Sequence, residues 1–201
     1  MTSGLSPRRE PRQVRAELTR ERILTAAAHV FTEHGYAAGT TNRIAERARI
    51  SIGSLYQYYP NKDAILAQLL IRHIDRGAGP VNADFSPGSL RALVRALVRD
   101  AITNHDDDPQ LLRIMIEQAP LSTELLETIT RHERTRVAQV RDLLAQHPDV
   151  AVRDLDTAAE LITFTVEMNT HKLLAYPRAV SVEALESELV DMVTRYLRGA
   201  Q

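Results

Sequence analysis

Apolar residues recur three and four positions apart along most of the chain, which is the spacing of amphipathic helices. The most regular stripe lies in residues 90–102, where leucine, valine, alanine and isoleucine follow one side of a helix. The same spacing predicts helices over 61–74, 110–118, 123–146 and 182–198. No segment of the sequence shows a convincing strand-like alternation. The pattern therefore predicts an all-α fold with about nine helices.

The segment 155–175 differs from the others because apolar residues cover two of its faces. One stripe contains Leu155, Ala159, Ile162, Val166 and Leu173, and the other contains Leu161, Phe164, Met168 and Ala175. A helix that is apolar on two sides needs two packing partners. We expect one partner to be the chain's own core and the other to be a second copy of the chain.

Two short helices joined by a tight turn are predicted over residues 40–62, which read TTNRIAERARISIGSLYQYYPNK. Thr40 and Thr41 suit the N-cap of the first helix, because a hydroxyl oxygen accepts an unpaired backbone N–H of the first turn. Ser51 suits the N-cap of the second helix, and Pro60 cannot continue that helix.

A third helix, over residues 19–34 and ended by Gly35, precedes this pair. Three of the six tyrosines of the chain, Tyr56, Tyr58 and Tyr59, fall within four residues of one another, so they cannot all face a core. Two helices and a turn, with polar and aromatic side chains on the second helix, form the layout that enters the major groove of DNA. The segment is therefore predicted to bind DNA.

The same segment resembles the DNA-binding domain of the TetR family of transcriptional regulators. The matching residues are Thr40, Thr41, Ile44, Ala45, Ala48, Ser51, Gly53, Leu55, Tyr56, Tyr58, Pro60 and Lys62. The sequence departs from the family pattern at Arg49, where a glycine is usual, and at Tyr59, where a phenylalanine is usual. A left-handed backbone at the turn costs a non-glycine residue on the order of 1 kcal/mol.

The resemblance implies a set of DNA contacts in this segment. The expected contacts are Thr40, Thr41, Arg43, Ser51, Ile52, Gly53, Ser54, Tyr56, Gln57, Tyr58 and Lys62. Thr40, Thr41 and Lys62 are expected to hold phosphates, and Tyr56 and Tyr58 to contact phosphates or base edges. Tyr59 is expected to pack inward.

The charge is divided unevenly along the chain. Residues 1–62 carry ten Lys or Arg and five Asp or Glu, whereas residues 63–201 carry 15 and 21. The basic segment 1–62 can contact DNA phosphates, and the acidic segment 63–201 repels them. We expect residues 1–13 to be a disordered basic arm, 14–62 to be the DNA-binding domain, and 63–201 to be a helical domain for effector binding and dimerisation.

The composition of the chain bears on its location and on the presence of a metal or cofactor. The chain has no cysteine, and no stretch approaches the roughly 20 apolar residues of a membrane span, so we expect a cytoplasmic protein without membrane contact. The seven histidines show no metal-ligand spacing, so no metal and no cofactor are predicted. The acidic run 106–108 precedes Pro109 and is interpreted as a helix cap.

The resemblance also implies a mostly apolar effector pocket and a dimer interface formed by the last two helices. The pocket candidates are Asn104, His105, Met115, Gln118, Phe164, Met168 and His171. The dimer candidates are Ile162, Val166, Leu173, Leu185, Leu189, Met192, Val193 and Tyr196.

These features predict a ligand-responsive repressor that binds a palindromic DNA operator as a homodimer and is released by a small, largely apolar effector. Two alternatives remain. One is a dimeric DNA-binding protein with no effector. The other is an all-helical enzyme, although the sequence has no nucleophile elbow, phosphate loop, dinucleotide glycine pattern or His-Glu-x-x-His motif.

Overall fold

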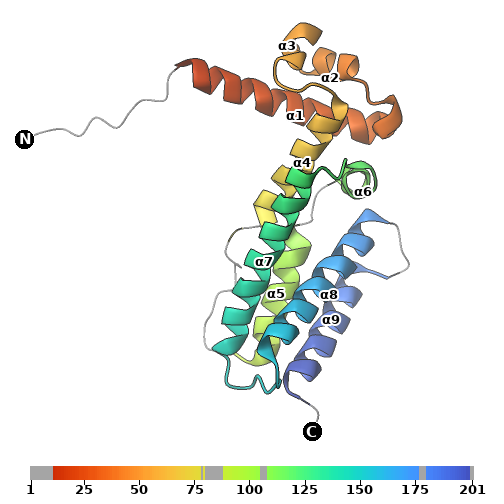
Figure 1. The fold of residues 1–201 in the computed structure, drawn as a ribbon. Helices are drawn as coiled ribbons and strands as arrows, with labels where there is room; N and C mark the ends of the chain where they lie inside the picture. Colours follow the sequence, from red (N-terminus) through yellow and green to blue (C-terminus); the bar gives the residue numbers. More distant parts are fainter. Residues whose placement is uncertain (1–10, 78, 80–87, 105–107, 177–179, 200–201) are drawn as a thin grey trace, which may run out of the picture. The chain divides into compact units, whose positions relative to one another are not determined.

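The computed structural model describes residues 11–77, 79, 88–104, 108–176 and 180–199. Over these residues the chain forms nine α-helices and no strand, as the sequence predicts (Figure 1). The helices are α1 (Pro11–Ala38), α2 (Thr41–Arg47), α3 (Ile52–Tyr56), α4 (Lys62–Gly77), α5 (Leu90–Asn104), α6 (Pro109–Gln118), α7 (Thr123–Ala145), α8 (Leu155–Ala175) and α9 (Val182–Leu197).

The chain divides into two compact units, Met1–Leu69 and Leu70–Gln201. The first contains α1, α2, α3 and the first half of α4, and the second contains the remaining helices. The division therefore lies inside α4 rather than at its first residue. Most of the glycine- and proline-rich stretch 77–88 lies outside the described residues.

The N-terminal unit has its own apolar core. Its fully buried side chains include Ile23 and Phe31 of α1, Ile44 of α2 and Leu55 of α3. The first helix begins at Pro11, well before the predicted start at residue 19, so 11–13 are helical and not part of a disordered arm.

Two glycines shape the end of α1. Gly35 has a positive φ of 73°, which breaks the helix where the sequence predicts its end. Gly39 lies so close to Phe31 that a Cβ there would stand 2.5 Å from the ring. The chain can therefore fold back over Phe31 before α2 begins.

The C-terminal unit is built around the packed faces of α5, α7, α8 and α9, which lie side by side in Figure 1. Each helix contributes an apolar stripe to one continuous core, because apolar residues three and four positions apart lie on one face of a helix. The core includes Leu97, Val140, Ile162, Val166 and Val193. None of the helices in the described parts of the chain is long and apolar enough to cross a membrane.

Candidate functional site

Side-chain caps fix the start of both helices of the predicted DNA-binding segment. The Thr40 hydroxyl accepts the backbone N–H of Arg43 at 3.3 Å, and the Ser51 hydroxyl accepts that of Ser54 at 3.1 Å. A capping hydroxyl of this kind stabilises a helix by about 1 kcal/mol. Because α3 has only five residues, its orientation depends strongly on this cap and on Leu55, which is fully buried.

The second helix presents its other side chains to solvent. Ile52, Gly53 and Tyr56 are exposed, and Gln57 follows at the exposed C-cap. Tyr59 is buried, which confirms that this tyrosine packs inward. The crowded tyrosines therefore divide into one structural side chain and two at the surface, Tyr56 and the half-buried Tyr58.

Contacts with neighbouring helices restrict both surface tyrosines. The hydroxyl oxygens of Thr41 and Tyr56 lie 3.1 Å apart, so α2 and α3 present one polar surface. The guanidinium carbon of Arg20, in α1, lies 5.9 Å from the centre of the Tyr58 ring. This geometry brings a cation beside the predicted groove-facing surface. Sequence reasoning missed Arg20, because it lies 38 residues before Tyr58 in an ordinary charged helix.

The turn between α2 and α3 contains the one non-glycine residue with positive φ among those described, Arg49, at 55°. The sequence predicts a left-handed residue at this position, because related sequences have glycine there. The Arg22 guanidinium of α1 donates to the carbonyl oxygens of Ala48 and Arg49, at 3.2 Å in the second case. Arg22 therefore holds the strained turn in place, a role that no local sequence pattern shows.

Replacing Arg49 by glycine is expected to stabilise the protein by about 1 kcal/mol, because glycine adopts a positive φ without steric cost. For a chain of this length the melting temperature should rise by roughly 2–4 °C. Circular dichroism during heating measures this change. Glu46→Gly is the matched control: it places glycine in the regular backbone of α2 and should lower the melting temperature.

Lys62, a predicted phosphate contact, lies at the start of α4 and reaches the end of α1. Its ammonium donates to the carbonyl oxygens of Tyr36 at 2.8 Å and Ala37 at 3.3 Å, and lies 4.2 Å from the centre of the Tyr36 ring. The Tyr36 hydroxyl donates to Asp63, and burial together with this contact raises the pKa of Tyr36. Lys62 therefore joins two helices, so its replacement would disturb the fold as well as any phosphate contact.

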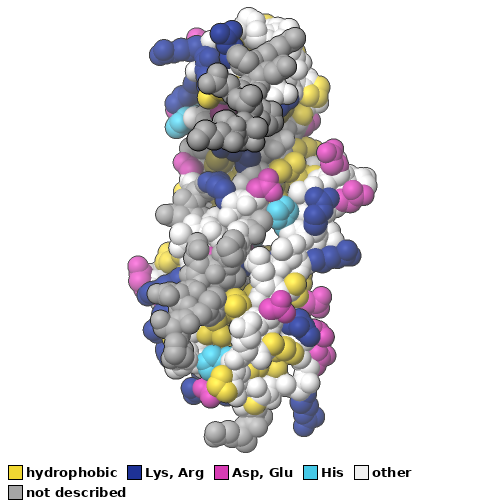
Figure 2. Space-filling model, turned by 90° about the vertical axis from the view of Figure 1, so that its left-hand side faces the viewer, with side chains coloured by type: hydrophobic (Ala, Val, Ile, Leu, Met, Phe, Trp, Pro, Cys, Tyr) yellow, Lys and Arg dark blue, Asp and Glu magenta, His cyan; other side chains and the backbone are white. Residues whose placement is uncertain are grey.

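The basic side chains of the N-terminal unit extend beyond the helix–turn–helix. On the face that Figure 2 shows, Lys and Arg side chains gather on this unit, while both signs of charge are interspersed on the C-terminal unit. Arg43 is exposed in α2, and Arg47, also exposed, pairs with Glu33 at 2.8 Å. The N-terminal surface is thus suited to a polyanion.

The α8 stripe that contains Ile162 packs into the core of the C-terminal unit, whereas most of the other stripe is exposed. Ile162 and Val166, predicted at a dimer interface, are buried in the chain's own core; the exposed fraction of Ile162 is 4 %. Phe164 and Met168, predicted in a pocket, are 43 % and 55 % exposed, and Leu161 is 53 % exposed. The Ile162 stripe therefore faces the core helices, and the exposed apolar side chains lie on another face of α8.

The dimer candidates of α9 differ in exposure. Leu189 and Val193 are buried in the core, whereas Met192 and Tyr196 are exposed and Leu185 is half-buried. Leu173 of α8 is also half-buried.

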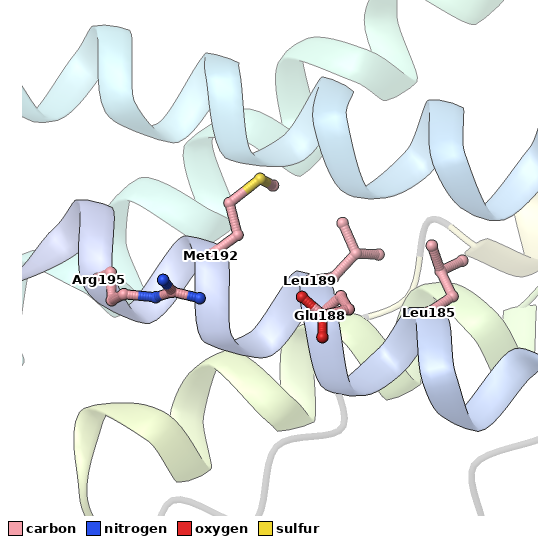
Figure 3. Close-up of a pocket in the computed structure, with 5 residues that line it drawn as sticks. All are labelled: Leu185, Glu188, Leu189, Met192 and Arg195. Atoms are coloured by element: carbon pink, nitrogen blue, oxygen red, sulfur yellow. The ribbon is translucent and has the colours of Figure 1, made fainter.

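A surface groove of about 410 Å³ runs along α9. Its lining residues are Leu185, Glu188, Leu189, Met192 and Arg195. Figure 3 shows Met192 reaching from α9 toward α8, with Glu188 and Arg195 on the same helix. The groove is open and apolar with charged edges, which is the character of a protein-binding surface rather than of an enclosed ligand pocket.

The remaining pocket candidates are spread over α5, α6 and α8. Met115 is buried in α6, Gln118 is exposed at the end of α6, and Asn104 donates to the carboxylate of Asp100 at 3.1 Å. His171 is half-buried, with its ring 6.3 Å from that of His73. His105 lies outside the described residues.

A buried ion-pair cluster, which sequence reasoning missed, lies within the C-terminal unit. Arg136 of α7 pairs with Asp100 of α5, and their side chains are only 11 % and 9 % exposed. The Glu167 carboxylate of α8 lies 3.8 Å from the Arg136 Nε. Burial raises the pKa of Glu167, Arg136 lowers it, and Asp100 raises it. The three residues are far apart in the sequence, and each resembles an ordinary surface charge.

In the described parts of the chain, no group of three or more His, Cys, Asp or Glu is placed to hold a metal ion. The Asp108 carboxylate accepts the backbone N–H groups of Gln110 and Leu111, at 2.9 and 3.1 Å. Asp108 is therefore the N-cap of α6, as the sequence predicts.

Comparison with known proteins covers both units. A family model described as bacterial regulatory proteins, tetR family, matches residues 23–69, and one described as tetracyclin repressor-like, C-terminal domain, matches 89–197. The HTH-type transcriptional regulator UidR of Escherichia coli is 26 % identical over 152 residues, which cover 69 % of this chain and 74 % of UidR.

Solved structures show the same fold. A bacterial regulatory protein in the tetR family from Rhodococcus RHA1 superposes with a TM-score of 0.70 at 22 % identity, over 91 % of this chain and 98 % of that one. The transcriptional regulator FadR from Bacillus subtilis, in complex with stearoyl-CoA, gives a TM-score of 0.63 at 19 % identity. This match covers 90 % of this chain and 99 % of the FadR chain.

Proposed function

The chain belongs to the TetR family of DNA-binding transcriptional regulators, and on that premise we propose that it is a homodimeric repressor released from a palindromic operator by a small-molecule effector. The observation that carries this proposal is the capped α2–α3 pair, which presents Tyr56 and Tyr58 beside a basic surface. The twofold symmetry of a homodimer matches that of a palindrome.

The α3 helix is the proposed groove-reading element. Tyr56 and Tyr58 would contact phosphates or base edges, and Ile52 would touch a thymine methyl group. The bond between the Thr41 and Tyr56 hydroxyls supports this role, because it limits the freedom of the Tyr56 ring before DNA arrives. Arg20 and Arg43 would add phosphate contacts.

The exposed apolar face of α8 and α9 is the proposed dimer interface. Members of this family dimerise, and both helices expose large apolar side chains, namely Leu161, Phe164, Met168, Met192 and Tyr196. A twofold axis brings the same surface of each copy together. Glu188 and Arg195, both at the α9 groove, would then pair across the axis.

An effector site is proposed in the C-terminal unit. The FadR structure with stearoyl-CoA indicates that this fold accommodates a ligand. The buried Asp100–Arg136–Glu167 cluster supports such a site here, because buried charges are more costly than apolar side chains unless they serve a structural or binding role. A ligand can release DNA only by binding one conformation of the protein more tightly than the other.

DNA binding can be tested with Tyr56→Ala. Genomic DNA selected by the purified protein should contain an inverted repeat, and the variant should bind this site roughly 10–100-fold more weakly in fluorescence anisotropy, as expected for loss of a base or phosphate contact. Tyr176→Ala, in the C-terminal unit, is the matched control and should keep the affinity of the unaltered protein. Failure to select any sequence, or equal binding by Tyr56→Ala, contradicts the proposal.

A further inference from the structure

Five buried side-chain polar atoms of the C-terminal unit have no hydrogen-bond partner among the described residues. Three of them are the Nη1 of Arg136 and the hydroxyls of Thr163 and Thr170. Thr163 and Thr170 lie one heptad apart on the buried face of α8, and Glu167 lies between them. Buried polar groups are almost always paired, so this concentration needs a physical explanation.

Arg136 and Thr163 line the same small hollow between α5, α7 and α8. These helices pack against one another within the C-terminal unit, as Figure 1 shows. The hollow measures about 10 Å³, and its walls are otherwise apolar apart from Glu167. The apolar walls are Leu97, Ala101, Val140, Ile162 and Val166. A space of this size holds about one water molecule or one polar atom of a ligand.

The unpartnered groups determine the kind of polar atom that fits. An Arg Nη1 can only donate, and a threonine hydroxyl can also donate. A carbonyl oxygen has two lone pairs, so one such oxygen can accept both hydrogen bonds. The hollow is therefore matched to a single acceptor oxygen.

The surrounding charges select against a charged ligand. The carboxylates of Asp100 and Glu167 both lie beside the guanidinium of Arg136, so an anion that enters the hollow would meet like charges. A cation would meet the unpartnered N–H of Arg136. A neutral acceptor satisfies both donors without burying another charge.

We propose that this hollow is the polar anchor of the effector site, and that it takes an uncharged molecule with a carbonyl oxygen, such as an amide, ketone or ester, and an apolar body. The inference rests on the proposed effector-responsive function and adds the chemical class of the ligand. The carbonyl enters between Arg136 and Thr163, and the apolar body parts the side chains of Leu97, Ile162 and Val166. Binding therefore moves α5, α7 and α8 relative to one another.

Calorimetric titration of the full chain with octanamide, octanoate and octylammonium tests the ligand class, because the three probes share the same chain length and differ in charge. Octanamide is expected to bind at least about tenfold more tightly than either charged probe, as expected for the cost of burying a charge. Equal or tighter binding of a charged probe overturns the proposal. Absence of binding by octanamide also overturns it, since the hollow would then hold water only.

Thr163→Val tests the site itself, because it removes one donor and keeps the side-chain shape. The affinity for octanamide should fall about 2–10-fold, and Thr163→Ser, which retains the hydroxyl, should restore it. The matched control is Thr194→Val, which removes another buried, unpartnered hydroxyl away from the hollow and should leave octanamide binding unchanged. Unchanged affinity in Thr163→Val, or an equal loss in the control, overturns the assignment. Operator binding is measured without any probe, so failure here leaves the proposed DNA binding intact.

Discussion

Replacing Leu161 by glutamate is expected to split the proposed dimer into folded monomers. The side chain lies on the exposed apolar face of α8, where it is 53 % accessible in the single chain. A twofold interface contains the change twice, so each dimer would bury two new carboxylates without partners. The dimer dissociation constant should rise at least about 100-fold, equivalent to roughly 3 kcal/mol. Sedimentation equilibrium measures this change directly.

The matched control for this variant is Leu126→Glu. It makes the same chemical change at a leucine that is 46 % exposed and belongs to α7, a helix that is not part of the proposed interface. The control should remain dimeric and bind the operator normally, whereas Leu161→Glu should lose operator affinity, because a monomer reads only one half-site. If the Leu161→Glu protein remains a dimer, Leu161 and its face of α8 are not part of the dimer interface. Helical circular dichroism equal to that of the unaltered chain excludes unfolding as the cause.

The sequence predicts the helices well because their periodic apolar positions and their caps are local features. Thr40, Ser51 and Asp108 cap helices as expected, since each cap involves residues two or three positions away. The inward packing of Tyr59 was predicted by the family pattern, in which an apolar ring occupies that position. Burial of Tyr59 confirms this.

The roles of the two α8 stripes could not be assigned from the sequence, because both stripes are apolar. From their hydrophobicity Ile162 and Phe164 are both expected to be covered, but only the packing of α8 shows that Ile162 lies in the core while Phe164 is exposed. Contacts between residues far apart in the sequence could not be predicted for a related reason. Arg22 bonds to the turn at Arg49, which lies 27 residues later in the sequence. Arg136 pairs with Asp100, which lies 36 residues earlier. No local spacing marks such pairs.

The largest loss of stability is expected when Arg136 is replaced by methionine. This change removes the cation that pairs with the buried Asp100 carboxylate and lies near Glu167, and breaking a buried ion pair in this way costs about 3–5 kcal/mol. The melting temperature should fall on the order of 10 °C. Arg141→Met is the control on the same helix: Arg141 pairs with Asp156 at the surface, so the melting temperature should be unchanged.

The double variant Asp100→Asn, Arg136→Met divides the expected loss of stability into two parts. One part is the attraction between Asp100 and Arg136, and the other is the cost of burying a carboxylate that has lost this partner. If the loss in Arg136→Met comes mainly from the uncompensated Asp100 carboxylate, neutralising that carboxylate should restore a large part of the stability. The double variant should then be more stable than Arg136→Met alone, and the two single losses should not add. Additive losses would mean that Asp100 and Arg136 do not interact in solution. Because the same guanidinium also lines the proposed ligand hollow, the double variant should fail to bind octanamide even where its stability is recovered, which would assign Arg136 one function in folding and another in recognition.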